Sequence, residues 1–339
     1  MVPSPSQSRL ARNLSSRPRL SVASLFSGCG GMDLGFEGGF DFLGGSYPET
    51  GFEVVWANEI NPRACETYRL NLGDRVVEGD VRDAIGSLPG RADVVIGGFP
   101  CQDISVNGKM RGVDGERSGL YVYLAEAVER TSPKAFVAEN VGGLLLKRNE
   151  PSLARVLGDF RSLGYDVGYA LYDAADYGVP QTRERVFIVG TRRGLPGFLP
   201  PAPPGSPRVT AREAIGDLEG MAEDRGFAHV WSRAGASGEQ GGRRLAADRP
   251  GYTVRAECHG NIHFHYSLPR RISMREAARL QSFPDGFAFP CGLRETERQI
   301  GNAVPPVLAW HVANAVMGSV SGGARRARAP VGDYLNAIA

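Results

Sequence analysis

Short apolar runs alternate with amphipathic segments between residues 21 and 190. The runs are rich in Val, Ile, Phe and Ala and are bounded by Gly, Asp or Pro, as expected of short strands buried on both faces. The strands predicted in this way are 22–26, 53–57, 76–77, 94–96, 135–138, 165–172 and 186–189. Because helical spacing returns between them, the pattern predicts an α/β fold with a doubly wound, mostly parallel, Rossmann-like sheet.

Two helix starts carry a local signal of their own. Asn61 followed by Pro62 is typical of an N-cap with proline at the first helical position. The sequence SMRE forms a capping box, in which Ser273 caps the helix and Glu276 reaches back to it. The remaining predicted helices span 120–128, 153–163 and 306–317.

The alternation ends near residue 193, and the chain then changes character. Residues 194–207, GLPGFLPPAPPGSP, read as a linker rich in proline and glycine. The following segment is irregular, and between residues 191 and 275 the 13 basic side chains outnumber the 8 acidic ones. We predict a basic disordered tail over 1–20, a first domain over 21–193, a smaller irregular domain over 194–272, a return to the first domain over 273–319 and a basic tail over 320–339.

Overall charge and hydropathy exclude some classes of protein. With 39 basic and 37 acidic residues the net charge is +2, so only local charge can indicate a polyanionic partner. No apolar run approaches the roughly 18 residues that a membrane helix needs. The first twenty residues lack the apolar centre of a secretory signal, and their Ser, Pro and Arg content predicts a basic tail, with an organelle transit peptide as the alternative. We expect a cytoplasmic protein.

The cysteines are scattered and do not form CxxC pairs, which argues against a disulfide framework and a zinc knuckle. They are Cys29, Cys65, Cys101, Cys258 and Cys291. The sequence CHGNIHFH offers a zinc interpretation through Cys258, His259, His263 and His265. We favour a strand whose residues alternate in direction, and we predict no metal site.

The first predicted strand runs directly into SLFSGCGGMDLGF, which opens a helix. Gly28, Gly30 and Gly31 would let the backbone approach a ligand at the helix N-terminus, although a plain tight turn would use the same glycines. Glu59 ends the second strand, where an acid commonly accepts hydrogen bonds from ribose, and Asp80 follows the third, where an adenine amino group could be read. Three strand ends supplying glycine, Glu and Asp in order favour a nucleoside-binding site.

A second group of reactive side chains follows the next strands. Cys101, in GGFPCQ, and Glu139 with Asn140, in AEN, are predicted at the carboxyl edge of the sheet, where ligands bind. A thiol beside a carboxylic acid, with no histidine to activate it, suits attack of sulfur on an electron-poor ring that the acid protonates. Arg183 and Arg185 lie two apart at the start of a strand and therefore on one face. They could hold a carboxylate, a phosphate or the carbonyl of a flipped base, or could be ordinary surface charge.

Together these motifs resemble the DNA (cytosine-5)-methyltransferase family of bacterial or phage type. The motifs FSGCGG, NE, GD, GFPCQ, ENV, QTRER, REAARLQSFPD and GNAVPP arrive in the order of the family and span residues 22 to about 317. The resemblance implies a class I methyltransferase fold, with 21–193 as the catalytic and cofactor domain. It implies that 194–272 is a target-recognition domain, and that the late GNAVPP helix packs back on the first domain.

The resemblance also implies S-adenosylmethionine as the cofactor, S-adenosylhomocysteine as its product and no metal. The implied cofactor residues are Phe26, Ser27, Gly28, Gly30, Gly31, Glu59, Ile60, Asp80, Val81, Pro100, Asn302, Ala303 and Val304. The chain departs from the family at Ile60, where an aromatic group often covers the adenine. It also carries an extra glycine-rich stretch over residues 37–51. Both departures bear on individual contacts and not on the identity of the cofactor.

The implied reaction is methylation of C5 of a cytosine that has been flipped out of duplex DNA at a specific site. The Cys101 thiolate would attack C6, and Glu139 would protonate or hydrogen-bond N3. Arg183, with Arg185 beside it, would contact the cytosine carbonyl or support Glu139. The implied DNA contacts are Gln102, Ser105, Asn107, Lys109 and Arg255. The other arginines of 194–272 are expected to face phosphates or solvent.

The expected partner is double-stranded DNA, bound by a monomer, and a cognate restriction endonuclease acting separately is one alternative to a solitary enzyme. Three other functions compete. The sizeable Arg-rich segment argues against a methyltransferase acting on transfer RNA. The intact Cys101, Glu139 and Arg183 argue against a catalytically silent DNA-binding relative. A nicotinamide dehydrogenase would share the sheet but leaves PCQ and ENV unexplained.

Overall fold

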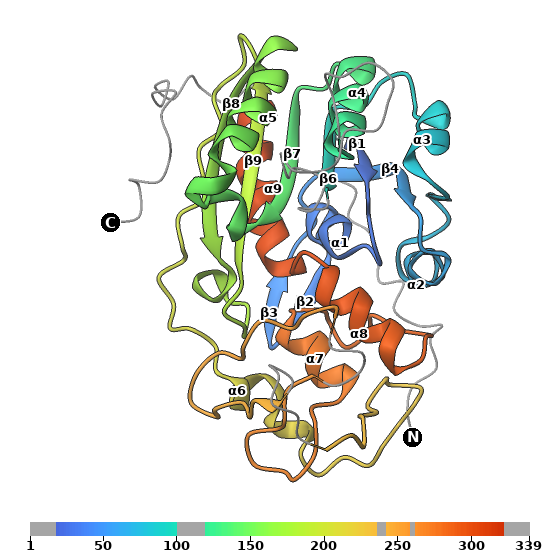
Figure 1. The fold of residues 1–339 in the computed structure, drawn as a ribbon, viewed down its shortest axis with the longest axis vertical. Coiled ribbons are helices and arrows are strands. Elements are labelled where there is room, and N and C mark those ends of the chain that lie inside the picture. Colours follow the sequence, from blue (N-terminus) through green and yellow to red (C-terminus); the bar gives the residue numbers. More distant parts are fainter. Residues whose placement is uncertain (1–17, 100–118, 236–241, 258–261, 322–339) are drawn as a thin grey trace.

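The computed structural model describes residues 18–99, 119–235, 242–257 and 262–321. Their main sheet has the strand order β5-β4-β1-β6-β7-β9-β8 and forms the upper body in Figure 1. Its strands are β1 Leu20–Leu25, β4 Phe52–Glu59, β5 Val76–Glu78, β6 Val94–Gly98, β7 Ala135–Val141, β8 Tyr165–Asp173 and β9 Glu184–Arg192. The first five pair in parallel, whereas β9 runs antiparallel to both β7 and β8. The predicted α/β fold with a mostly parallel sheet is confirmed.

Helices cover both faces of this sheet, because alternate strand residues point to opposite sides. On β1, Val22 belongs to the core shared with α1 and α9, whereas Ala23 belongs to the core shared with α4 and α5. The helices of the upper body are α1 Gly31–Glu37, α2 Pro62–Leu72, α3 Val81–Ala84, α4 Tyr121–Thr131, α5 Glu150–Ser162 and α9 Pro306–Val320. Short 3-10 turns are η1 Ile85–Ser87, η3 Gly142–Leu145, η4 Lys147–Asn149 and η5 Ala174–Tyr177.

Both predicted helix starts are confirmed. The Asn61 side chain accepts a hydrogen bond from the Arg63 N–H, and Pro62 opens α2. At the start of α7, Ser273 and Glu276 form the reciprocal capping box. Local sequence alone is enough here, since a cap satisfies backbone groups only a few residues away.

The extra glycine-rich stretch forms a hairpin that the sequence pattern did not predict. Its strands are β2 Phe40–Phe42 and β3 Gly45–Tyr47, paired antiparallel. Phe40 stacks on Tyr47 with 5.1 Å between ring centroids, and Tyr47 meets the edge of Trp310 on α9 at 5.4 Å. Three-residue strands are too short to show a period of two. The hairpin thus packs against α9, the late helix that lies on the main sheet.

The lower body in Figure 1 contains little regular structure. Its helices are α6 Ala211–Ile215, α7 Met274–Leu280 and α8 Leu293–Asn302, with the 3-10 turn η6 Gly216–Leu218. One hydrophobic core joins Ile215, Val254 and Ile262 to Leu280 and Ile300. Residues 273–302 therefore pack with the segment before them, and the same core includes Cys29 of the turn between β1 and α1. Asn71 and Asn61 of the upper body also bond to Ala288 O and Glu295, so these residues contact both bodies and the boundary at 273 stays a prediction.

One stretch of the described chain, Leu293–Val320, is long and apolar enough to cross a membrane by length and composition. Of its most apolar window, 67% lies buried inside the structure. The stretch is also divided, because α8 ends at Asn302 and α9 begins at Pro306. Its apolar character is accounted for by the α9 core.

Candidate active site

The turn between β1 and α1 is shaped by three residues with positive φ. They are Phe26 at 55°, Gly28 at 57° and Gly30 at 94°, a conformation that strains an aromatic residue and suits glycine. Glu59, at the end of the neighbouring strand β4, accepts the Gly28 N–H at 2.9 Å and the Asn61 N–H at 2.8 Å. Burial raises the pKa of Glu59, while these backbone hydrogen bonds oppose the rise. The predicted glycine turn and ribose-binding acid therefore lie side by side.

Asn58 ties the next strand ends together. Its carbonyl accepts the Ser27 N–H at 3.0 Å, and its side-chain amide donates to Val77 O and Gly79 O, both at 3.0 Å. The ends of β1, β4 and β5 are thus joined by one buried asparagine, through its backbone carbonyl to β1 and through its side-chain amide to β5. This brings the predicted acid Asp80, which follows Gly79, to the same edge of the sheet.

Asp80 also starts α3. Its carboxylate accepts the Arg82 N–H at 2.9 Å and forms an ion pair with the Arg82 side chain at 2.5 Å. The hydrogen bond from the Arg82 side chain lowers the pKa of Asp80 to about 2. Val81 is buried. Ile60, which directly follows Glu59 at the end of β4, is 64% exposed. An exposed aliphatic side chain at this position is available to cover a flat ring.

The late motif closes against the glycine turn. A Cβ on Gly31 would lie 2.5 Å from Val304 O and 3.0 Å from Ala303 Cβ, so only glycine permits this approach. Of the predicted late residues, Ala303 and Val304 are buried and Asn302 is exposed. By contrast, a Cβ on Gly28 would meet nothing within 4 Å, which leaves open space beside the Glu59 carboxylate. The residues present therefore fit a nucleoside-containing cofactor such as S-adenosylmethionine.

Helix α8 also reaches this edge, which the sequence reasoning missed. The Asn61 side-chain amide donates to Glu295 Oε1 at 2.7 Å, and the Arg298 charge acts to lower the pKa of Glu59. No local motif marks these two residues, since they lie more than 200 positions from Glu59 along the chain.

Glu139 lies where β7 passes the end of β6. In the parallel register Gly98 pairs with Glu139, and a Cβ on Gly98 would lie 2.9 Å from Glu139 Oε2. The Asn140 amide donates to Phe99 O at 2.9 Å and so holds the backbone just before the PCQ motif. The predicted residues Pro100, Cys101, Gln102, Ser105, Asn107 and Lys109 lie outside the described residues.

The Glu139 carboxyl is held by Arg185. Arg185 Nε lies 2.9 Å from Glu139 Oε1, and only 9% of Glu139 is exposed. Burial raises the pKa of Glu139, and the opposing charges of Arg185 and Arg183 do not cancel that rise. Such a carboxyl keeps a proton to higher pH than an exposed one, as a group that donates to a ring nitrogen must.

Arg183 is placed differently from its neighbour. Its guanidinium is 2% exposed and donates to Val254 O at 3.0 Å, Gly301 O at 2.7 Å and Ala303 O at 3.1 Å. The described ion pair to Glu139 therefore comes from Arg185, while Arg183 joins the lower body to the late motif. Its charge still acts on Glu139.

The arginines of 194–272 do not all face phosphate or solvent, which corrects the prediction for Arg271. This side chain is 1% exposed and donates to Ala234 O, Gly235 O and Ile262 O at 2.6–3.0 Å. Its guanidinium lies 4.5 Å from the Phe264 ring centroid. A segment with little regular structure leaves many backbone carbonyls unpaired, and a buried guanidinium can satisfy several of them. Arg255, the predicted DNA contact, is exposed.

The histidines of CHGNIHFH are buried where the structure describes them. His263 is 6% and His265 0% exposed, and burial lowers both pKa values, that of His263 to about 4. Phe264 between them makes only isolated bridges, to Arg244 and Arg271, in place of the predicted strand. In the part of the chain that the structure describes, no three His, Cys, Asp or Glu side chains form a metal-binding group.

Comparison with known proteins matches the chain to one family over most of its length. Residues 20–232 and 223–318 match the model of the C-5 cytosine-specific DNA methylase family. The chain is 37% identical over 339 residues to the type II methyltransferase M.NgoFVII of Neisseria gonorrhoeae, covering 89% of this chain and 88% of that protein. It is 35% identical over 338 residues to the type II methyltransferase M.BbvI of Brevibacillus brevis, covering 86% and 89%.

Solved structures show the same fold. A prophage-encoded protein of E. coli has a TM-score of 0.68 at 24% identity over 89% of this chain and 99% of that one. The S. pombe Dnmt2 methyltransferase has a TM-score of 0.60 at 15% identity over 88% and 98%. The fold is thus that of an α/β methyltransferase. The chain belongs to the C-5 cytosine-specific DNA methylase family, and its enzyme class is DNA (cytosine-5)-methyltransferase. Membership implies S-adenosylmethionine as the methyl donor.

Proposed function

We propose that this protein is a site-specific DNA methyltransferase that modifies C5 of a cytosine flipped out of duplex DNA. The observation that carries the proposal is the buried Glu139 carboxyl, with its raised pKa, near the carboxyl end of β7 and beside Gly98 of β6. A pyrimidine stacked in a duplex could not reach such a group, so base flipping is part of the proposal.

The chemistry follows from the side chains. The Cys101 thiolate adds to C6 of the ring, while the protonated Glu139 carboxyl donates to N3 and stabilises the developing charge. This makes C5 nucleophilic. S-adenosylmethionine, when bound, supplies an electrophilic methyl group. Loss of the C5 proton to a base and departure of the Cys101 sulfur then restore the ring. Arg185 holds the Glu139 carboxyl in position. Arg183 acts on Glu139 through its charge and bonds to the carbonyls of Val254, Gly301 and Ala303.

We assign the cofactor to the edge formed by the glycine turn, Glu59, Asp80 and the turn at 302–304. Glu59 would bind ribose hydroxyls and Asp80 the adenine amino group, with Ile60 against the ring. Gln102, Ser105, Asn107, Lys109 and Arg255 are the proposed DNA contacts. The proposed assembly is a monomer on double-stranded DNA, and type II relatives favour a role beside a restriction endonuclease.

The test uses purified protein, mixed-sequence duplex DNA and S-adenosylmethionine labelled in its methyl group. Label on C5 of cytosine within one short sequence is the expected result, and label on transfer RNA alone would replace the proposal with the RNA alternative. Glu139→Gln should lower kcat by about 10²–10⁴-fold, the usual contribution of a positioned acid. A Cys101→Ser protein that still methylates would exclude the covalent mechanism.

A further inference from the structure

Five buried groups form a closed ring of hydrogen bonds between the two bodies. The Val254 N–H donates to Gln181 Oε1 at 2.8 Å, and the Gln181 amide donates to Gln281 Oε1. The Gln281 amide in turn donates to Ala303 O at 2.5 Å. Arg183 completes the ring, because it donates both to Ala303 O at 3.1 Å and to Val254 O at 3.0 Å.

The ring is inaccessible to water. Gln181, Gln281 and Val254 are 0% exposed, Arg183 2% and Ala303 8%. Buried amides that lose a partner are costly, so each bond constrains the geometry of the next. Both backbone groups of Val254 and the carbonyl of Ala303 are therefore fixed relative to one another.

The two residues that join the ring through their backbone, Val254 and Ala303, are next to the proposed binding sites of DNA and of the cofactor. Val254 is followed by the exposed Arg255, the proposed DNA contact. Ala303 is followed by Val304, whose carbonyl packs on Gly31 of the glycine turn. A Cβ on Gly301 would lie 2.6 Å from the Arg255 carbonyl carbon, so the two segments also touch directly.

We propose that this ring couples DNA binding to cofactor binding, with Gln181 and Gln281 as its positioning residues. DNA that restrains Val254 also restrains the turn at 301–304, so the cofactor then orders less of the chain when it binds. Coupling of this kind is reciprocal, and each ligand raises the affinity for the other by the same factor. The inference rests on the proposed function.

The experiment measures binding without turnover. The dissociation constant of S-adenosylhomocysteine is determined by calorimetry with and without a duplex containing the methylated sequence, for wild type and for Gln281→Met. This change keeps the size of the side chain and removes both hydrogen bonds. In wild type, DNA should tighten binding about 5-fold or more, and in Gln281→Met the factor should fall to about 1.

Gln299→Met is the matched control. Gln299 is 4% exposed on α8 in the same body but is not a member of the ring. Its variant should keep the wild-type factor even if either dissociation constant changes. A wild-type factor of 1, or the same factor in wild type and Gln281→Met, would overturn the coupling.

Hydrogen exchange on the wild-type protein is independent of whether Gln281→Met folds. Adding S-adenosylhomocysteine without DNA should slow exchange of the Val254 amide, and an unchanged rate would contradict the inference. The results also distinguish failure of the coupling from failure of the proposed function. A protein that methylates DNA but shows no coupling would disprove only the role of the ring. A protein that binds no duplex would disprove both the proposed function and the coupling.

Discussion

At the scale of single residues, burial decides how each charged group behaves. Asp33, in the first turn of α1, is 0% exposed and accepts hydrogen bonds from the Ser24 hydroxyl at 2.7 Å and the Tyr68 hydroxyl at 2.8 Å. Burial raises its pKa to about 6, whereas an unfolded aspartate titrates near 3.9. A carboxyl of this kind behind the glycine turn makes folding depend on pH.

We predict the sign and size of that dependence. Since the folded pKa is the higher one, the stability linked to Asp33 is complete below about pH 4 and is lost as the pH rises through about 6. The loss amounts to about 3 kcal/mol in the free energy of unfolding. Asp33→Asn should remove this dependence on pH. The free energies of unfolding of variant and wild type, measured by denaturation, should therefore converge at low pH and separate at neutral pH. Asp41→Asn, at an exposed carboxyl of β2, is the control, and parallel curves for Asp33→Asn would contradict the prediction.

Arg271 gives a second prediction at this scale. Arg271→Lys keeps the charge but cannot donate to three carbonyls from one plane, and should lower the free energy of unfolding by about 2–4 kcal/mol. Hydrogen exchange should speed up at Ile262 and Ile272 and remain unchanged in β1 and β6. Arg225→Lys, at an exposed arginine of the same body, should change neither. Equal effects of the two substitutions would show that burial of Arg271 is unimportant.

At the scale of elements, the close approach of β6 to β7 positions the reactive carboxyl. Gly98 leaves room for Glu139 to reach Arg185, and Asn140 holds the end of the β6 connection by its bond to Phe99 O. The adjacent strands thus set the geometry of a site whose reactive side chains come from several segments.

Gly98→Ala should therefore impair catalysis more than folding. The new Cβ would displace the Glu139 carboxylate from Arg185, and we expect kcat to fall about 10–100-fold, less than on removal of the acid because the carboxyl is shifted and not lost. DNA affinity should stay within about 2-fold. Gly158→Ala in α5, where a Cβ meets nothing within 4 Å, should leave kcat unchanged and stabilise the helix by about 0.5–1 kcal/mol. Wild-type kcat in Gly98→Ala would show that the carboxylate adapts.

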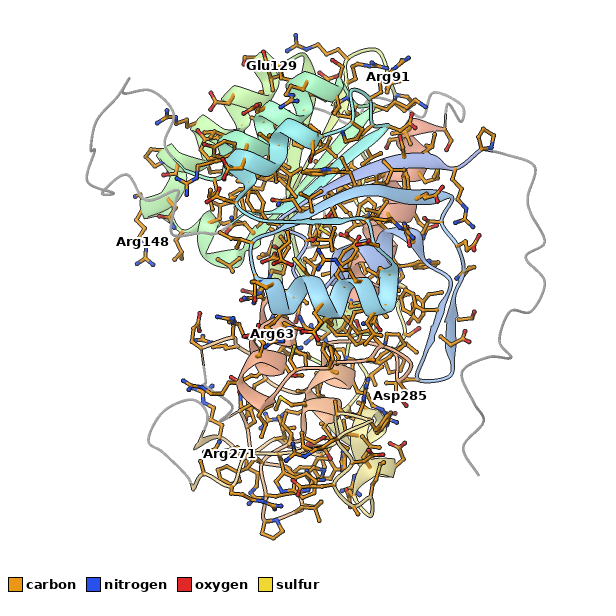
Figure 2. All side chains as sticks on the ribbon, turned by 90° about the vertical axis from the view of Figure 1, so that its right-hand side faces the viewer. Arg63, Arg91, Glu129, Arg148, Arg271 and Asp285 are labelled. Carbon is orange, nitrogen blue, oxygen red and sulfur yellow. The ribbon has the colours of Figure 1, made fainter. Side chains whose placement is uncertain are left out.

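At the scale of the whole molecule, residues 191–275 carry 13 basic and 8 acidic side chains although the net charge of the chain is only +2. Figure 2 shows Arg91 at the upper end of the molecule and Arg271 in the lower body. Arg91 and Arg255 are both exposed, but only Arg255 is next in sequence to Val254, a member of the hydrogen-bonded ring. Binding to a polyanion should therefore depend on position and not on total charge.

Salt dependence tests this. If Arg255 contacts a phosphate, Arg255→Gln should reduce the slope of log affinity against log salt by about 0.9, the value for one released counterion. Fluorescence anisotropy of a labelled duplex between low and moderate salt measures the slope. Arg91→Gln removes the same charge at the far end and should leave the slope unchanged. Equal slopes for all three proteins would exclude a phosphate contact at Arg255.

The amino-acid sequence by itself determined the strands of the main sheet, both capped helix starts and the order of the motifs around the site. These features are local, since a strand period, a cap or a glycine turn depends on residues a few positions apart. The glycine turn and Glu59 met as predicted, because parallel strands end at one edge of a sheet.

Only the tertiary structure decided which side chains meet across long separations. Long separations are bridged by the pairing of Arg185 with Glu139, the bond of Arg271 to Gly235 O, the bond between Gln181 and Gln281, and the approach of α8 to Asn61. These contacts join segments 36 to more than 200 residues apart. A buried arginine and a solvated one have the same letter in the sequence. What separates them is the backbone that surrounds each guanidinium, and packing of distant segments creates that surrounding.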